Sequence, residues 1–188
     1  MFVRDFREFD PQYCANLEAN LWIAYYNHRF PRLFFLLLKL NYIFLQPSMR
    51  LTLFGAYYTT RAAVVFRLTK GHENKQKTAK YLERYFKLIS NHSVQPFDYQ
   101  KVAELELAWW MVDRYPDRYK TKRSTAITAS MAAMVQLSPG RLQKYGENRA
   151  AAMELLGKYH EDTSTKVDWQ SLHDYLKAAY QALYVAIQ

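Results

Sequence analysis

Cysteine, glycine and proline are scarce in this chain, and each shortage excludes a class of structure. The 188 residues include one cysteine, Cys14, which excludes an intrachain disulfide framework and a cysteine-rich metal site and suits a reducing compartment. The five glycines and six prolines are too few for a fibrous or disordered chain, and the prolines stand where helices would begin or end. Half of the residues are hydrophobic, so the chain can bury a core.

Long apolar runs are also missing. Residues 1–8 mix charges of both signs where an export signal needs an apolar stretch, so we expect a cytoplasmic protein. The most hydrophobic stretch, 33–45, is thirteen residues long and contains Lys39 and Asn41, whereas a membrane span needs about twenty apolar residues. We expect a helix buried nearly all round in the protein's own core, and the alternative is a helix that lies on a membrane surface.

Apolar spacing and capping residues predict an all-α protein of about eight helices. Asp10, Asn74 and Asp98 have the side chains that cap helix N-termini, and Gly71 is a C-terminal cap. Turns are expected at 46–48 and over 161–166, and strand-like alternation is absent. The expected helices cover 11–29, 32–45, 49–69, 75–90, 99–115, 121–136, 139–159 and 169–187.

The two halves of the sequence carry the same pattern, and the second half begins near Phe97. Residues 9–22 and 97–110 both read F-D-x-Q-x-x-A-x-L-E-x-x-x-W, with seven of fourteen positions identical at an offset of 88. Later matches follow in the same order, and they pair Phe54-Gly55 with Tyr145-Gly146, Arg61-Ala62-Ala63 with Arg149-Ala150-Ala151, and Phe86 with Tyr180. We predict two tandem four-helix repeats, 1–94 and 95–188, packed as one globular unit around an approximate two-fold axis.

Charged residues interrupt the apolar stripes at matching places in both halves. Glu18 and Glu106 lie on stripes that should be buried, and so do Arg61 and Arg149. Because buried charges need partners, we expect Glu18 to pair with Arg61 and Glu106 with Arg149. The alternative is that the two glutamates converge on a shared site at the two-fold axis, with Trp22, Trp109 and Trp110 as aromatic residues of the pocket.

A duplicated di-iron site of the ferritin type is disfavoured. Such a site needs Glu-x-x-His on its helices, and no Asp or Glu here has a histidine three residues later. A glycine-rich phosphate loop and a G-x-S-x-G motif are also missing. We therefore assign no metal, no cofactor and no catalytic residue from the sequence.

Positive charge is concentrated in the first half. Residues 1–94 hold fourteen Lys and Arg against six Asp and Glu, whereas residues 95–188 hold twelve against eleven. A basic stripe recurs at three- and four-residue steps along one face of the helix expected over 75–90, and it consists of Lys77, Lys80, Arg84 and Lys87. The matching helix of the second half lacks it, so the shared fold does not require it. A solvated face is the simplest interpretation, and the functional one is a contact with an acidic protein, nucleic acid or anionic membrane.

The sequence carries no motif of a known family. We expect a non-enzymatic helical module that binds an acidic or apolar partner through the basic stripe or through the groove between the halves. The alternative is an enzyme or small-ligand carrier with its site at the two-fold axis, where Glu18 and Glu106 would meet.

Overall fold

The computed structural model describes residues 8–45, 48–72, 74–161 and 168–188, and within them the chain is helical with no strand, as predicted. The turn predicted at Gln46-Pro47 and most of the loop predicted over 161–166 lie outside the described residues, as does the segment 1–7. The α-helices are α1 (Pro11–Tyr26), α2 (Phe30–Leu45), α3 (Met49–Leu68), α4 (Lys75–Ser90), α5 (Tyr99–Arg114), α6 (Arg123–Val135), α7 (Gln143–Glu161) and α8 (Trp169–Ile187).

The predicted N-terminal caps hold the helix ends. Asp10 accepts hydrogen bonds from the backbone amides of Gln12 and Tyr13 at 2.9 and 3.2 Å, and Asp98 accepts the equivalent pair at the start of α5. Asn74 accepts from the amide of Lys77 at 2.9 Å. These side chains satisfy amides that have no partner within the helix. The predicted glycine cap of α3 was wrong, because the C-cap residue is Thr69; Gly71 follows two residues later with a φ of 96°, a left-handed conformation that glycine adopts without strain.

Two predicted boundaries were wrong around proline. α1 ends at Tyr26 rather than near Arg29, and Phe30-Pro31 begins α2 instead of separating the two helices. The reason is that proline is tolerated in the first turn of a helix, where its missing amide would have no partner. Pro139 likewise opens a short 3₁₀ helix, Pro139–Leu142, that precedes α7.

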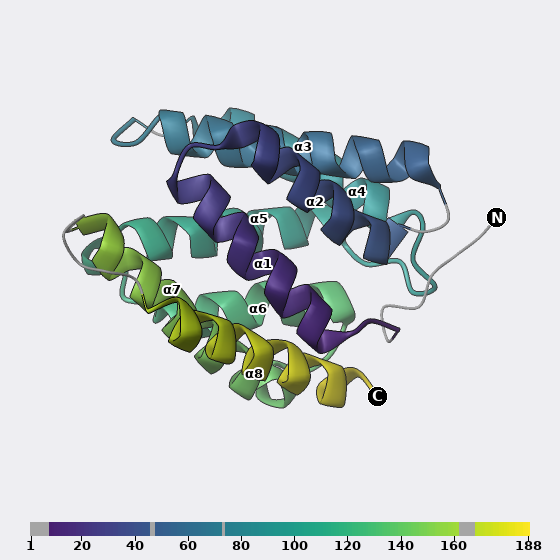
Figure 1. Cartoon of the computed structure of the whole chain (residues 1–188). Helices are drawn as coiled ribbons and strands as arrows, with labels where there is room; N and C mark the ends of the chain where they lie inside the picture. The colour runs from purple at the N-terminus through teal and green to yellow at the C-terminus, as the bar shows by residue number, and fades with distance from the viewer. Residues whose placement is uncertain (1–7, 46–47, 73, 162–167) are drawn as a thin grey trace.

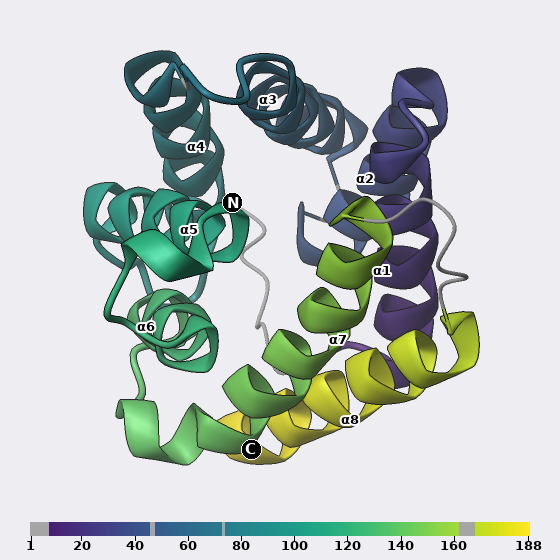
Figure 2. The same cartoon turned by 90° about the vertical axis from the view of Figure 1, so that its left-hand side faces the viewer.

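The eight helices form a closed ring. Each helix packs on the next in chain order, and α8 packs on α1 to complete the circle. Figure 1 shows α1 and α8 crossing the front of the molecule, with α3 and α4 above α5 and α6. Figure 2 looks along the axis of the ring and shows the helices arranged around a common centre. Neighbouring helices bury their apolar faces against each other, and the largest fully buried side chains include Trp109 and Tyr145.

α2 is not buried all round, contrary to the prediction from its composition. Leu33, Leu37 and Leu45 are buried between α2 and its neighbours, but the Phe35 side chain on the opposite face is 61% exposed. The ring explains this, because a helix in a single closed layer has one face toward the inside and one toward solvent. Among the described residues, no helix is long and apolar enough to cross a membrane.

Glycine allows α7 to approach α6 closely. A Cβ atom on Gly146 would lie 1.9 Å from Thr128 Oγ1 and 2.7 Å from the Ser124 carbonyl oxygen. Gly55 of α3 is similar, since a Cβ there would lie 2.8 Å from a Leu45 methyl group. Gly157, also in α7, has no atom within 4 Å of its Cβ position.

We predict that Gly146→Ala lowers the free energy of unfolding by about 1–3 kcal/mol, because α7 must move away from α6. Gly157→Ala is the matched control in the same helix. It should raise the free energy of unfolding by about 0.5–1 kcal/mol, because alanine restricts the unfolded chain more than glycine does. Urea unfolding followed by helical circular dichroism measures both, and a stable Gly146→Ala protein would contradict the close packing.

Candidate functional site in the central cavity

The ring encloses a cavity of about 510 Å³. Every one of the eight helices contributes at least one side chain to its wall, so the cavity is a product of the whole fold. The wall is largely apolar and aromatic, and all three tryptophans that the sequence suggested for a pocket lie on it. They are Trp22 of α1 and Trp109 and Trp110 of α5.

A buried ion pair stands in this wall. Arg149 of α7 donates from Nη2 to Glu18 Oε1 of α1 at 2.8 Å, and the Glu18 residue is only 3% exposed. The Glu18 carboxylate also accepts from Trp22 Nε1 at 3.0 Å and from the Tyr180 hydroxyl at 2.6 Å. Arg149 donates in addition to the Tyr145 hydroxyl at 2.7 Å. We call these five residues the Glu18–Arg149 cluster.

The ion pair corrects the predicted pairing. Glu18 was expected to bind Arg61 of α3, but α1 packs on α2 and α8, and α3 packs on α2 and α4. Arg61 instead lies over the ring of Tyr81 in α4, with its guanidinium carbon 5.7 Å from the ring centre. Arg149 is the counterpart of Arg61 in the second half of the sequence, so Glu18 takes its partner from the opposite half.

Glu106 of α5 lines the same cavity but is held by neutral groups. Trp110 Nε1 donates to its Oε1 at 3.0 Å, and the Ser130 hydroxyl donates to its Oε2 at 2.7 Å. The predicted pairing of Glu106 with Arg149 was therefore wrong, because no salt bridge joins these two residues within the described part of the chain. Glu18 and Glu106 thus each accept a hydrogen bond from the indole of the tryptophan four residues later. Their remaining partners differ.

The cluster strongly perturbs its titratable groups. Burial by itself lowers the pKa of Arg149, but the Glu18 carboxylate and the neighbouring hydroxyls outweigh it, so this pKa stands well above its ordinary value. Burial, and then the charge of Glu18, raises the pKa of Tyr180 well above its ordinary value. Burial also raises the pKa of Tyr145 to about 12. Glu18 and Arg149 therefore form a fixed ion pair bounded by neutral tyrosines.

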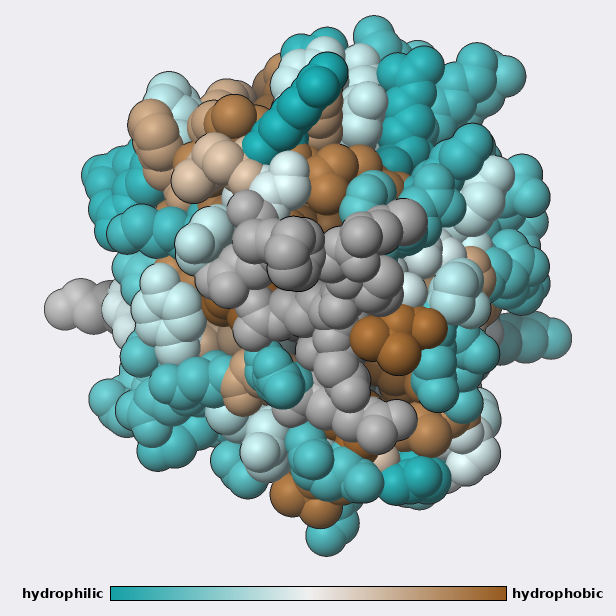
Figure 3. Space-filling view, turned by 90° about the vertical axis from the view of Figure 1, so that its right-hand side faces the viewer, coloured by the Kyte–Doolittle hydropathy of each residue, from teal (hydrophilic) through white to brown (hydrophobic). Residues whose placement is uncertain are grey.

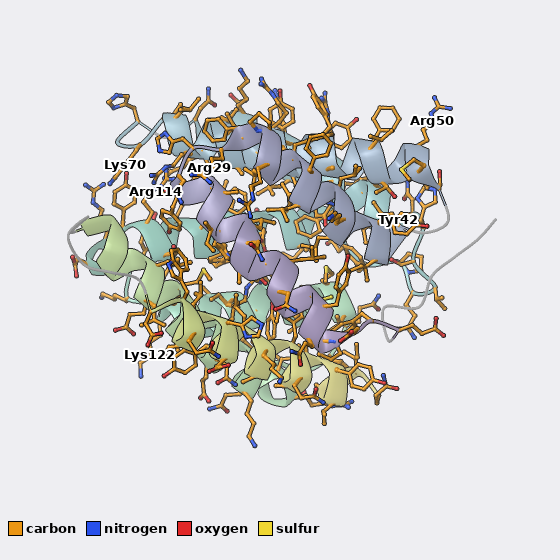
Figure 4. All side chains as sticks on the ribbon, viewed as in Figure 1. Arg29, Tyr42, Arg50, Lys70, Arg114 and Lys122 are labelled. Carbon is orange, nitrogen blue, oxygen red and sulfur yellow. The ribbon has the colours of Figure 1, made fainter. Side chains whose placement is uncertain are left out.

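The cavity reaches the surface at one end of the ring. There its lining comes from helix ends and the turns beside them, and Lys70 and Pro116 at this end are exposed. The cationic residues of this end, which we call the mouth, are Arg67, Lys70, Arg114 and Arg123. Figure 4 shows Lys70 and Arg114 at the same end of the molecule.

Contacts with neighbouring groups orient the mouth arginines. Arg114 lies over the Phe66 ring at 3.5 Å from its centre and donates to the Phe66 carbonyl at 2.6 Å. Arg123 Nε lies 2.6 Å from Asp113 Oδ1. Burial raises the pKa of Asp113, although Arg123 and the other nearby arginines oppose this effect. The mouth is therefore a positively charged rim over an aromatic wall.

A second cavity, of about 140 Å³, lies beyond the cluster. It shares part of the wall of the larger one, including Glu106, Arg149 and Tyr180, so the polar groups stand between the two spaces. Its other lining residues are mostly apolar, among them Met131, Met134 and Leu183. Among the described residues, no group of three His, Cys, Asp or Glu side chains could hold a metal ion.

The basic stripe lies away from this site. Lys77, Lys80, Arg84 and Lys87 are all exposed on α4, and Leu82, Phe86 and Ile89 on the same helix are buried. The structure thus brings the two glutamates, Arg149 and the three tryptophans together around the cavity. It leaves Arg61 and the stripe outside the cavity wall.

Sequence reasoning missed Tyr145 and Tyr180 as members of the site. A signal was present, because the two tyrosines align with Phe54 and Phe86 of the first half. The second half therefore adds a hydroxyl at each position, and both hydroxyls bind the ion pair. Asp113 and Ser130 gave no comparable signal, since their neighbours come from other helices.

We predict that Glu18→Gln lowers the free energy of unfolding by about 3–5 kcal/mol, because it leaves the Arg149 charge buried without a counterion. Glu106→Gln is the matched control, which should cost about 1 kcal/mol because it leaves no charge unpaired. Urea unfolding measures both free energies. Equal losses would show that the ion pair of Glu18 stabilises the fold no more than the neutral hydrogen bonds of Glu106 do.

Buried and partly buried tyrosines lead us to expect a loss of stability at alkaline pH. Burial is the largest cause of a raised pKa at five of them, which are Tyr25, Tyr26, Tyr85, Tyr145 and Tyr180. The unfolded chain releases these protons near the ordinary value of 10.0, before the folded chain does. Stability should therefore fall as the pH rises above about 10, by up to about 1.4 kcal/mol per pH unit for each tyrosine.

Tyrosinate absorbance, recorded on the native protein and in denaturant, measures this difference. The five tyrosines should ionise near the ordinary pKa only in denaturant. If every tyrosine of the native protein titrates together near pH 10, the phenols are not buried as described.

Comparisons with known proteins found no match to this chain among protein-family models, curated proteins or solved structures. The residues of the cavity and their geometry are therefore the grounds for inferring what the protein does.

Proposed function

We propose that the protein binds a small organic molecule in the central cavity, and that this molecule has an apolar or aromatic body and an anionic group. The observation that carries the proposal is a space of about 510 Å³ enclosed by all eight helices, with a mainly apolar wall and a few fixed polar groups. Ligand sites in proteins have this size and this composition.

The charge of the wall supports an anionic group on the ligand. The lining includes five Arg and Lys side chains and three carboxylates, and four of the five cations belong to the mouth. At the mouth the four cations outnumber the one carboxylate beside them, Asp113, and such an excess of positive charge attracts an entering anion. An acidic group would thus remain at the mouth while the apolar body passes the tryptophans.

The inner end of the cavity offers hydrogen bonds. Glu106 accepts from two neutral donors, and a carboxylate has lone pairs for further donors. A hydroxyl or amine at the far end of the ligand would be bound there. The Glu18–Arg149 cluster beside it would keep the wall rigid, because its charged groups already bind one another.

We also propose that the ring arose by duplication of a four-helix unit, so that the cavity lies on an approximate two-fold axis. The sequence repeat supports this origin, as do the glutamate–tryptophan hydrogen bond in α1 and α5 and the close-contact glycines in α3 and α7. The two copies would then have diverged at Arg61 and Arg149, only one of which faces the cavity.

An enzyme with its site at this axis is the second candidate. Its base would be Glu106, because Glu18 is bound to Arg149 whereas Glu106 is held by two neutral donors. The contacts support binding more directly than a reaction, since they define a shaped and charged space.

The binding proposal can be tested with anilinonaphthalene sulfonate, a probe that combines an aromatic body with an anionic group. We expect saturable binding to the native protein, with energy transfer from the cavity tryptophans to the probe. Ala63→Phe and Thr59→Phe should each weaken binding at least about tenfold, because both positions line the cavity and the added ring fills it.

Ala178→Phe is the matched control, because Ala178 is exposed on α8 and does not line the cavity. Thermal unfolding shows whether each variant is folded. If folded Ala63→Phe and Thr59→Phe proteins bind the probe as tightly as Ala178→Phe does, the cavity is not the site. Native mass spectrometry of the purified protein would identify a ligand that copurifies with it.

A further inference from the structure

Aromatic and cationic side chains form a continuous surface on the outside of the ring. On α3, Arg50 lies over the Phe54 ring, Phe54 stacks on Tyr58, and Tyr58 contacts Tyr57 edge-on. Tyr57 then contacts Tyr81 of α4 with ring centres 6.5 Å apart, and Arg61 lies over the same Tyr81 ring. The basic stripe of α4 continues this surface, because Lys77 and Arg84 lie one helical turn to either side of Tyr81. We call the whole set, Arg50, Phe54, Tyr57, Tyr58, Arg61, Tyr81 and the basic stripe, the α3–α4 surface.

Large apolar side chains on α3 are exposed beside these cations. Phe54 is 43% exposed and Tyr57 is 46% exposed, and Met49 and Leu53 on the same helix are exposed to a similar degree. Phe35 and Tyr42 of the adjacent α2 extend the apolar exposure. Figure 3 views the face with the end of α2 and the start of α3, and it shows hydrophobic atoms at the surface among hydrophilic ones. Clusters of this kind mark contact sites rather than ordinary solvated surface.

Acidic residues are missing from the same part of the chain. Residues 19–72, which include all of α2 and α3, contain no Asp or Glu and seven Lys and Arg. α4 contains five Lys and Arg and a single acidic residue, Glu83. The surface therefore combines exposed apolar side chains with an excess of positive charge. Its partner should offer both an apolar region and negative charge.

We propose that the α3–α4 surface docks on the headgroup layer of an anionic lipid bilayer. Arg50, Arg61 and the basic stripe would bind lipid phosphates, and the exposed apolar side chains of α3 would enter the boundary between headgroups and acyl chains. Tyrosine and other amphipathic aromatic side chains favour that depth, because the ring is apolar and the hydroxyl stays hydrated.

The side chains of this surface favour a bilayer over the other negatively charged partners. Nucleic acid would use the arginines and could stack on tyrosines, but it offers no apolar layer for Met49 and Leu53. An acidic protein would need a matching apolar patch of its own. A bilayer supplies phosphates and an apolar layer together over any area, and it requires no specific register along α3.

Cosedimentation of the full chain with vesicles tests this proposal. The native protein should bind vesicles of phosphatidylcholine mixed with phosphatidylglycerol at low salt, bind them less at high salt, and bind pure phosphatidylcholine weakly. Replacing Lys77, Lys80 and Arg84 together by Gln should lower the vesicle partition coefficient about 100-fold, at about fivefold for each cation near the surface.

The control for charge replaces Lys120, Lys144 and Lys177 by Gln, a change of equal size at exposed positions outside this surface. Equal binding of the two triple variants would show that net charge alone attracts the protein, and it would overturn the proposal.

The apolar contribution needs its own pair of variants. Leu53→Ser with Phe54→Ser should weaken binding to the anionic vesicles at least about tenfold, because exposed apolar area no longer enters the lipid. Val185→Ser on α8 removes an apolar side chain elsewhere that is even more exposed, at 65%, and should leave binding unchanged. All three positions are on the surface, so the variants should keep the native circular dichroism.

Two further results would overturn the proposal in favour of another partner. If the native protein binds a DNA or RNA duplex but neither kind of vesicle, the surface is a nucleic-acid site. If it forms a dimer that Leu53→Ser with Phe54→Ser dissociates and it does not bind vesicles, a second copy of this chain covers the surface. None of these outcomes depends on the cavity, so they leave the proposed ligand site untouched.

Discussion

The buried ion pair between Glu18 and Arg149 is the interaction on which the arrangement of this protein depends. A buried charge is tolerated only beside its partner, and these two partners lie 131 residues apart on α1 and α7. The two charges meet because α8 packs on both α7 and α1 and so brings the last helices back to the first one. The pair thus couples the end of the chain to its beginning, and the closed ring is what leaves a cavity inside.

The differences between the two halves concentrate at this pair. Arg149 is enclosed by Glu18, Tyr145 and the Trp109 ring, with its guanidinium carbon 5.2 Å from the ring centre, whereas its counterpart Arg61 lies against Tyr81 on α4. If the ring arose by duplication as we propose, the two copies of this arginine now differ in position. Arg149 lies in the cavity wall, and Arg61 lies on the outer surface. The added hydroxyls of the second half follow the same division, because they are needed only where the charge is buried.

Two surfaces of different character follow from one ring. The inner one is enclosed, aromatic and built from all eight helices, which suits a small molecule that must be desolvated to bind. The outer one is open, basic and confined to neighbouring helices, which suits an extended partner such as a bilayer.

The helix positions, their N-terminal caps and the faces of the helices could be predicted from the sequence, because they depend on interactions between residues close together in the chain. Helix positions followed from apolar spacing, and Asp10, Asn74 and Asp98 cap the helices at the predicted residues, because a cap acts within three residues of itself. The spacing of Glu18 and Trp22, and of Glu106 and Trp110, placed each pair on one helix face, and each pair is hydrogen-bonded. The repeat also led to the alternative prediction that both glutamates and the three tryptophans share one site.

Only the tertiary structure decided which helices are neighbours. The periodicity of a stripe shows which face is apolar but not what covers it, so Glu18 was assigned to Arg61 instead of Arg149. The same limit made α2 seem buried all round, although a ring of single helices exposes the far face of each, and Phe35 lies there. The size of the cavity and its charged mouth could not be predicted for the same reason, because their lining residues come from every helix and are brought together only by closing the ring.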